Sequence, residues 1–389
     1  MNHPPKLLVS QPDLGPAEAD AVQAVLQSHW VGMGPRTAAF EAALSDYLGV
    51  RHVVATSSCT AALHLALAAL ERDHRHQVIV PSLTFAATVQ AILMAGYQPV
   101  FADVNAESLT LDPDDVARLV TDRTRAILPV HLAGYPCDLS RLRALAKPAG
   151  IPVVEDAAHA FGSTCEGAPI GRLGHAVCFS FSSNKNITCG EGGAIATDSN
   201  TLASRARQMR YLGISRDTWQ RQDQSRPWEY SVAGPGFRCH LSDVHASIGL
   251  AQLQRLPEFA ARRRRLASIY DTALAPLHGL APVRRDLAGT IPNLYIVRVT
   301  KGRRDRVFER LLAAGILCGV HYSPNHLQPA FQAYARPLPV TEHVAGEILS
   351  LPLHTRLTDA DAEWVAEELQ SALESDLIPT HTPAAAAVG

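Results

Sequence analysis

The sequence predicts an α/β fold with a mostly parallel central sheet sandwiched by helices, followed by a smaller α+β C-terminal domain. Over residues 50–200, short apolar runs bounded by turn residues alternate with segments of helical periodicity, as in parallel strands joined by right-handed crossovers. A long amphipathic pattern from Ser242 to Leu274 then leads into a second group of elements. We therefore expect a large domain with an N-terminal arm over residues 1–245, a smaller domain over residues 246–378 and a disordered tail over residues 379–389.

The elements of the large domain follow from their apolar periods, about two residues for strands and about 3.6 for helices. Its expected helices occupy residues 17–30, Arg36–Leu48, residues 61–70, a stretch ending at Met94, and Leu111–Leu119. Its expected strands are His52–Ala55, Gln77–Pro81, Tyr97–Val104, Ala126–Val130, Ile151–Val154, Ala176–Phe181 and Ala194–Thr197.

The smaller domain shows the same two periods over shorter stretches. Strands are expected at Leu294–Val299, Leu317–Tyr322 and Ser350–His354, and helices at Asp305–Ala314 and Asp359–Leu373. No GxGxxG or Walker-type loop follows any expected strand, which argues against a dinucleotide-binding fold or a nucleotide hydrolase.

Composition narrows the functional class. Of the 389 residues, 47% are hydrophobic and 19% charged, and a net charge of −2 gives no electrostatic reason to expect nucleic acid or a membrane surface as partner. The seven cysteines are scattered without a CxxC pair, which disfavours a disulfide framework or zinc site and fits a reducing compartment. The N-terminus lacks the apolar stretch of a signal peptide, so we expect a cytoplasmic protein.

Two ionisable residues follow two of the buried runs. Asp156 comes directly after Ile151–Val154 and Glu155, and Lys185 follows Ala176–Phe181. The carboxyl ends of parallel strands share one edge of a sheet, where open α/β folds bind ligands. A lysine can form a Schiff base with pyridoxal phosphate (PLP), and a carboxylate can keep the pyridine nitrogen protonated. On spacing alone, a surface lysine and a helix-capping aspartate explain the same pattern.

Neighbouring motifs favour the cofactor interpretation. A pattern EDAAxA, then FSF, Lys-Asn and GxGG occurs here as Glu155–Ala160, Phe179–Phe181, Lys185-Asn186 and Gly190–Gly193. It resembles the DegT/DnrJ/EryC1/StrS sugar aminotransferases, from about residue 8 to about residue 372. The resemblance implies the fold-type I, aspartate aminotransferase-like fold, with Lys185 and Asp156 as the Schiff-base lysine and the pyridine partner.

The same resemblance assigns the remaining cofactor contacts. The turn Ser58-Cys59-Thr60 precedes a helix whose first N–H groups suit a phosphate, although it is equally readable as a plain N-cap. The resemblance makes it the phosphate site, together with the Ser180 hydroxyl. It places Phe85 against the pyridine ring. Without the resemblance, Phe85 is equally well interpreted as a residue of the hydrophobic core. It places His159, one helical turn after Asp156, near the phenolic oxygen, where a structural histidine is the alternative.

Further contacts are implied on the substrate side. The segments GISRDTW (213–219) and PGFRCHLSD (235–243) resemble a loop that crosses to the partner subunit, with Arg238 touching phosphate there; the departure at His240 leaves that contact open. Trp30, His321, Tyr322 and His326 are implied to lie near the substrate. His321 and His326 alone also suggest a metal, but no third ligand stands nearby, so no metal is expected.

The resemblance implies a homodimer with active sites at the subunit interface. It implies amino transfer from L-glutamate to a keto sugar, a nucleotide-linked 4-keto-6-deoxyhexose, by ping-pong kinetics, in amino-sugar biosynthesis for a surface polysaccharide or secondary metabolite. A 3-keto sugar and an aminocyclitol ketone stay open as acceptors. A dehydratase of the same fold carries histidine in place of the lysine, and a non-catalytic PLP-binding regulator is the remaining alternative.

Overall fold

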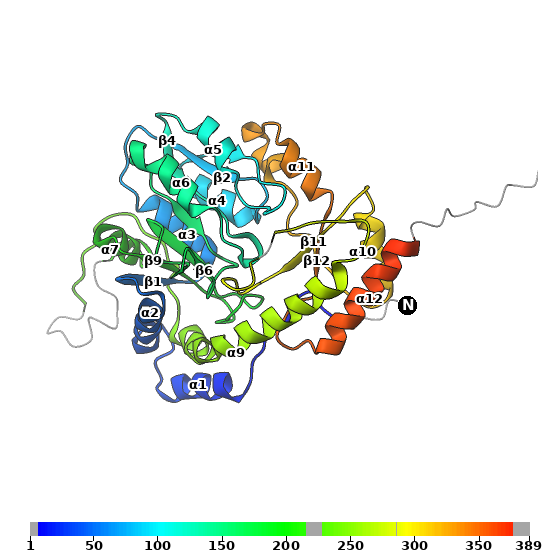
Figure 1. Ribbon diagram of the computed structural model, residues 1–389. Coiled ribbons are helices and arrows are strands. Elements are labelled where there is room, and N and C mark those ends of the chain that lie inside the picture. Colours follow the sequence, from blue (N-terminus) through cyan, green and yellow to red (C-terminus); the bar gives the residue numbers. More distant parts are fainter. Residues whose placement is uncertain (1–6, 215–227, 285, 376–389) are drawn as a thin grey trace, which may run out of the picture.

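The computed structural model describes residues 7–214, 228–284 and 286–375 (Figure 1). The expected tail at 379–389, the first six residues and residues 215–219 of the GISRDTW segment lie outside the described residues. Figure 1 shows a larger sheet-containing unit and a smaller one, with the long helix α9 running from one to the other.

The centre of the larger unit is a continuous sheet. Two groups, β1-β9-β8-β5 and β3-β2-β4, are joined by parallel bridges from Ile127 to Val153 and from Val130 to Asp156. Within the described part of this sheet, β9 runs antiparallel to its neighbours β1 and β8 and the other pairs are parallel, so the mostly parallel sheet is confirmed. The strands are β1 (His52–Thr56), β2 (Gln77–Pro81), β3 (Gln98–Ala102), β4 (Thr124–Ile127), β5 (Val154–Asp156), β8 (Ala176–Ser180) and β9 (Gly193–Thr197), beside a separate hairpin of β6 (Thr164–Cys165) and β7 (Ala168–Pro169).

Helices cover both faces of this sheet because its strands alternate their apolar side chains between two cores. In β1, for example, Val54 packs with α3, α4 and α7, whereas Val53 and Ala55 pack on the opposite face with α2, α5, α6 and the first half of α9. The helices are α1 (Pro16–Gln27), α2 (Pro35–Leu48), α3 (Cys59–Ala68), α4 (Ala86–Met94), α5 (Pro113–Leu119), α6 (Leu139–Ala146) and α7 (Asn200–Met209), with 3-10 turns at Leu132–Gly134 and Lys147–Ala149.

The smaller unit is built on the second half of α9. Leu256 and Phe259 of this helix belong to the core of the large sheet, whereas Leu266 and Tyr270 belong to a separate core with α10 and α12. One helix therefore supports both units. The elements are α9 (Asp243–Leu274), β10 (Leu280–Ala281), β11 (Tyr295–Val299), α10 (Arg304–Ala313), α11 (Pro339–Ala345), β12 (Ile348–Leu351) and α12 (Asp359–Ser375), with 3-10 turns at Asn325–Leu327 and Pro329–Tyr334.

Several expected elements differ from the structure. Residues 317–322 form no strand, because their main chain divides its hydrogen bonds between Leu7 and Ser350. Strand β12 begins two residues before the expected start at Ser350. The helices α6, α7 and α11 were not expected, although Asp138 and Ser199 are N-caps whose side chains accept backbone N–H groups.

A buried carboxylate ties the first helices to α9. Asp243 is 1% exposed, and its oxygens accept hydrogen bonds from the backbone N–H groups of Gly34 (2.8 Å), Arg36 (3.0 Å) and Thr37 (2.9 Å), and from the Thr37 hydroxyl. Helix α2 has no side-chain cap of its own, so Asp243 caps it from a distant part of the chain.

We expect Asp243→Ala to lower the free energy of unfolding by roughly 2–4 kcal/mol, because it leaves several buried donors without an acceptor. Urea denaturation followed by circular dichroism measures the loss. Asp20→Ala, at an exposed position of α1, is the control and should change stability by less than about 0.5 kcal/mol. A loss below about 1 kcal/mol for Asp243→Ala would show that this cap is dispensable.

Candidate active site

A cavity of about 620 Å³ lies where β5 and β8 end and α3 and α4 begin. This is the carboxyl edge of the parallel sheet, where ligands of open α/β folds bind. Residues from both units line it, including most of those singled out in the sequence: Ser58, Cys59, Thr60, Phe85, Asp156, His159, Ser180, Lys185, His321 and Tyr322.

Asp156 ends β5 with its carboxylate buried at 4% exposure. One oxygen accepts a hydrogen bond from the Thr88 hydroxyl at 2.7 Å and the other from the Ala158 N–H at 3.0 Å. Since Thr88 uses its proton on Asp156, it accepts its 2.8 Å hydrogen bond from the Thr84 hydroxyl. Burial raises the pKa of Asp156, and the Thr88 hydrogen bond opposes that rise. The remaining acceptor sites of this carboxylate suit a cationic N–H donor, such as a pyridinium.

Lys185 is held at the end of the turn that follows β8. Its N–H donates to the Ser182 carbonyl at 3.1 Å, and its half-buried side chain lines the cavity. Burial lowers the pKa of Lys185 to about 8, although the negative charge of Asp156 opposes this shift. A lysine with this pKa has a substantial uncharged fraction near neutral pH, and the uncharged amine is the form that attacks a carbonyl.

The opposite end of the cavity offers hydrogen-bond donors to an anion. Helix α3 begins there with its first turn unpaired within the helix, and Ser58 caps it by accepting the Ala61 N–H at 3.1 Å. A Cβ on Gly193 would lie 2.4 Å from the Ser58 carbonyl carbon and 2.5 Å from the Cys59 nitrogen. Only glycine lets β9 start this close to the helix, which explains the last glycine of the GxGG turn.

His159 and Tyr322 meet beside the lysine. The Ala133 N–H donates to Nδ1 of His159 at 3.2 Å, so the proton of a neutral imidazole is on Nε2, which lies 3.1 Å from the Tyr322 hydroxyl. Burial holds the pKa of His159 well below its usual value, and the positive charge of Lys185 adds to this effect. His159 lies on a turn rather than one helical turn after Asp156 as expected, but it still reaches the cavity.

Comparison with known proteins agrees with this geometry. The sequence matches the family model "DegT/DnrJ/EryC1/StrS aminotransferase family" over residues 12–370. The chain belongs to this family.

Solved structures resemble it over nearly its whole length. The aminotransferase TlmJ from Streptoalloteichus hindustanus is 38% identical, with a TM-score of 0.88 over 95% of this chain and 99% of that one. The sugar aminotransferase CalS13 from Micromonospora echinospora is 33% identical (TM-score 0.87; 94% and 99%). Spr1654 from Streptococcus pneumoniae, solved in its PMP-form, is 31% identical (TM-score 0.89; 95% and 100%). The prediction of a PLP-dependent aminotransferase with this fold is confirmed.

The residues present fit that cofactor. Asp156 would hold the pyridine nitrogen, Lys185 the aldehyde carbon, and the first turn of α3 with Ser180 the phosphate. Phe85, 60% exposed at the rim, is available to lie against the ring, with its own ring centre 5.6 Å from that of Tyr322.

Three predicted site residues do not line this cavity. His326 is 2% exposed, and its ring contacts the Ser82 hydroxyl at 2.7 Å and Glu342 at 3.3 Å, so it supports the loop that carries Phe85. Trp30 donates its indole N–H to the Met33 carbonyl at 3.1 Å. Arg238 is exposed on the segment before α9, and its backbone pairs with Tyr211.

Sequence reasoning missed other lining residues, notably the hydroxyl pair Thr84 and Thr88 and the residues Ser182, Ser183, Asn184 and Glu191. The signal for the first pair was their spacing of four residues across the start of α4, which places both on one helical face.

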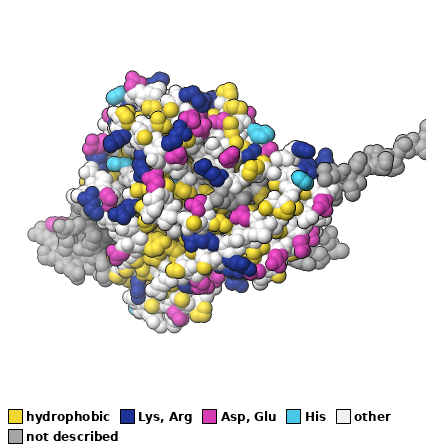
Figure 2. Space-filling model, viewed as in Figure 1, with side chains coloured by type: hydrophobic (Ala, Val, Ile, Leu, Met, Phe, Trp, Pro, Cys, Tyr) yellow, Lys and Arg dark blue, Asp and Glu magenta, His cyan; other side chains and the backbone are white. Residues whose placement is uncertain are grey.

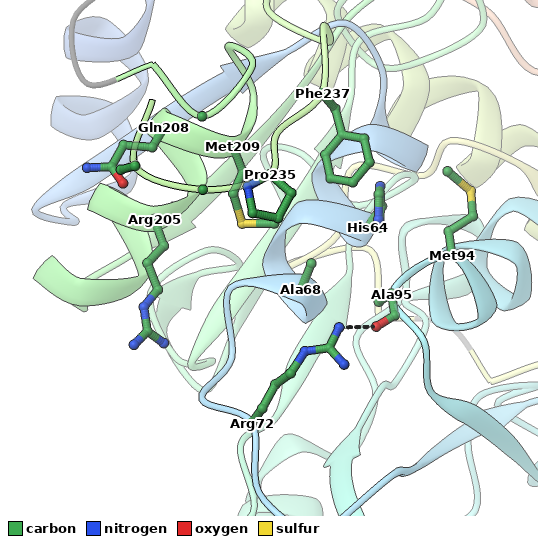
Figure 3. A pocket seen from close by; sticks show the side chains of 13 residues that line it. His64, Ala68, Arg72, Met94, Ala95, Arg205, Gln208, Met209, Pro235 and Phe237 are labelled. Carbon is green, nitrogen blue, oxygen red and sulfur yellow. Dashed lines mark hydrogen bonds between the residues drawn. The ribbon is translucent and has the colours of Figure 1, made fainter. Parts of the chain in front are cut away.

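A second cavity, of about 320 Å³, lies away from this chemistry, between α3, α7 and residues 233–237 (Figure 3). Met94 and Phe237 border it, and the Phe237 ring packs edge-on against His64 at 4.5 Å. The described residues that line it include neither a carboxylate nor a lysine, so they offer no alternative to the Asp156–Lys185 site.

The described ranges contain neither a metal cluster nor a membrane-spanning helix. In the described ranges, no three His, Cys, Asp or Glu side chains cluster so as to hold a metal ion. No helix within those ranges combines the length and apolarity that a membrane span requires. On the face drawn in Figure 2, cationic and anionic side chains are interspersed.

The lowered pKa of Lys185 predicts the pH dependence of cofactor capture. Burial disfavours the charged amine, so we expect the rate of PLP attachment to the cofactor-free protein to rise with pH and level off above about pH 8. For an ordinary lysine, of pKa 10.5, the rate would still be climbing at pH 9.5. Stopped-flow absorbance measures the rate, and a small free amine reacted in parallel corrects for the protonation of PLP. A rate that still climbs at pH 9.5 after this correction contradicts the assignment.

Proposed function

We propose that this protein transfers the amino group of L-glutamate to the carbonyl of a keto sugar, with a nucleotide-linked 4-keto-6-deoxyhexose as the acceptor, by ping-pong kinetics. The observation that carries the proposal is a lysine of lowered pKa and a buried aspartate lining one cavity of an aminotransferase-family chain. The solved relative CalS13 is a sugar aminotransferase by name, which supports the class of acceptor.

In this proposal, Lys185 and Asp156 have different roles in the reaction. PLP, when bound, supplies an electron sink that stabilises the electron pair left by a broken C–H bond. Lys185 Nζ would hold the cofactor covalently. Once displaced by the donor, the free amine would take the proton from the donor Cα and deliver it to the cofactor carbon to which it had been attached. Asp156 keeps the ring nitrogen protonated, and Thr88 and Ala158 hold that carboxylate in place.

The substrate side of the cavity suits a sugar. His321 comes from the smaller unit and bonds Ser350 through Nδ1 at 2.8 Å, and burial with the nearby Lys185 charge lowers its pKa to about 4. Burial also raises the pKa of Tyr322. Both side chains are therefore uncharged near neutral pH, and uncharged donors and acceptors match the hydroxyl groups of a sugar.

A second copy of the chain completes the site in this proposal. No arginine is among the described residues that line the cavity, and Lys185 is its one cation, yet glutamate and a nucleotide sugar carry several negative charges. The segment before α9 presents Arg238 with exposed apolar side chains, Trp228 at 69% and Val232 at 60% exposure. A symmetric homodimer that buries these residues would bring Arg238 to the partner's cavity. All seven cysteines are unpaired, which supports a reducing, cytoplasmic location.

The acceptor is tested with the purified protein in its pyridoxamine form. We expect nucleotide-linked 4-keto-6-deoxyhexoses to regenerate the aldehyde absorbance, whereas 3-keto sugars and an aminocyclitol ketone do not. Recovery with one of those ketones instead would replace the acceptor. If glutamate and other amino acids leave the PLP-form spectrum unchanged, the aminotransferase proposal fails, and a non-catalytic PLP-binding protein is the surviving alternative.

Lys185→Ala should still bind pyridoxamine phosphate but lose turnover by at least about 10³-fold, since no other base holds this position.

The shared site is tested by complementation. Lys185→Ala and Arg238→Ala chains, each inactive or strongly impaired alone, are expressed together. A mixed dimer has one cavity with intact Lys185 and the partner's intact Arg238, so random pairing should restore roughly a quarter of wild-type turnover. Activity that stays at the sum of the two parents would contradict a site shared between subunits.

A further inference from the structure

Four consecutive arginines, Arg262–Arg265, lie in the middle of α9, and one of them differs from the others. Arg262 and Arg265 are paired with the carboxylate of Asp359, and Arg264 donates to the Thr290 carbonyl at 2.8 Å from a partly buried position. Arg263 points inward and is only 4% exposed. It lies between the two units, where α9 passes from one core to the other.

The positive charge of Arg263 is buried, and the groups that accept its hydrogen bonds are main-chain carbonyls. Its Nη1 donates to the carbonyl oxygens of Pro292 (3.3 Å), Asn293 (3.3 Å) and Leu353 (3.1 Å), and its Nε has no hydrogen-bond partner. Within the described ranges, no carboxylate lies at ion-pair distance from it. Burial lowers the pKa of Arg263 to about 10, so the guanidinium remains charged near neutral pH. Burying a cation without a counter-ion destabilises the folded protein, so the presence of Arg263 at this position requires an explanation.

Two of the carbonyls that hold Arg263, those of Pro292 and Asn293, belong to a loop that hydrogen-bonds to the chain around Lys185. The Asn293 side chain donates to the Asn184 carbonyl at 3.0 Å and contacts the Asn186 side-chain oxygen at 3.4 Å. Asn186 in turn donates to the Ile291 carbonyl at 3.2 Å and to the Phe161 carbonyl at 3.0 Å. The residues on both sides of Lys185 are therefore fixed by the loop that Arg263 anchors.

The charge of Arg263 also acts on the lysine. Burial is the main cause of the lowered pKa of Lys185, and the positive charge of Arg263 lowers it further. The negative charge of Asp156 acts in the opposite direction. The Arg263 guanidinium therefore opposes the effect of the Asp156 carboxylate on the amine.

We propose that Arg263 is a positioning residue for Lys185: through the 290–293 loop it fixes the chain on both sides of the lysine, and it places a positive charge without a counter-ion behind that loop. The inference rests on the proposed function only in taking Lys185 as the lysine that binds the cofactor. It makes the amine depend on a residue of the helix shared by the two units.

The charge part is tested in the cofactor-free protein, by reductive methylation of Lys185 across pH 6–10 with mass spectrometry of its peptide. The chain has four lysines, and the exposed Lys147 and Lys301 are internal references in every sample. Arg263→Gln keeps N–H donors for the carbonyls but removes the charge, and should raise the labelling midpoint by about half to one pH unit. Arg263→Lys keeps the charge and should label with the wild-type midpoint. Arg264→Gln, the matched control on the same helix, should also leave the midpoint unchanged.

A labelling midpoint of Arg263→Gln equal to that of the wild type overturns the charge part. If circular dichroism shows that this variant does not fold, Arg263→Met takes its place with the same expectation. The backbone part is decided by Asn293→Ala, which keeps Arg263. We expect its labelling midpoint to stay at the wild-type value while PLP attachment slows at least about fivefold; unchanged attachment overturns it. These readouts need no sugar or amino donor, so they stay distinct from a failure of the proposed function, which would appear as an inert wild-type protein.

Discussion

The buried carboxylate of Asp156 and the half-buried amine of Lys185 share one cavity, and most of the site follows from holding an ionised acid and a readily deprotonated amine side by side. Left alone, burial would protonate the acid and deprotonate the base. The structure opposes the first with donors from Thr88 and Ala158, and permits the second, because the uncharged lysine is the reactive form. Hydrogen bonds thus stabilise the charged form of Asp156, whereas burial stabilises the uncharged form of Lys185, although both groups face the same cavity.

The parallel sheet makes that arrangement possible. Strands β5 and β8 are adjacent and parallel, with Asp156 opposite Cys178, so the residues that follow both strands emerge at the same edge. The antiparallel strand β9 returns the chain to the start of α3, and Gly193 lets the two backbones approach. Cavity-lining residues that are far apart in sequence are thereby brought together by the strand order rather than by any local motif.

Sequence reasoning reached the parts of the site that depend on local pattern. Apolar runs located nearly all strands of the large sheet, and the motifs around Asp156, Lys185 and Ser58 named residues that the structure brings to one cavity. It was less successful where position depends on packing between distant segments. His326 shares a short motif with His321 and Tyr322, yet the 3-10 turn at Asn325–Leu327 turns it into the core beneath Ser82. Likewise, residues 317–322 have a strand-like composition, but their hydrogen bonds are shared between two separate partners.

The smaller unit contributes more to the chemistry than the positions of Asp156 and Lys185 suggest. His321 and Tyr322 line the cavity opposite the sheet, and Asn293 hydrogen-bonds to the residues that flank the lysine. All of them depend on how that unit is seated on α9, where Arg263 binds carbonyls from two of its loops. A shift of the smaller unit relative to the sheet would change the backbone around Lys185 and the positions of His321 and Tyr322 together. The lysine turn and the wall of the cavity that His321 and Tyr322 form are therefore both positioned by the packing of one helix between two cores.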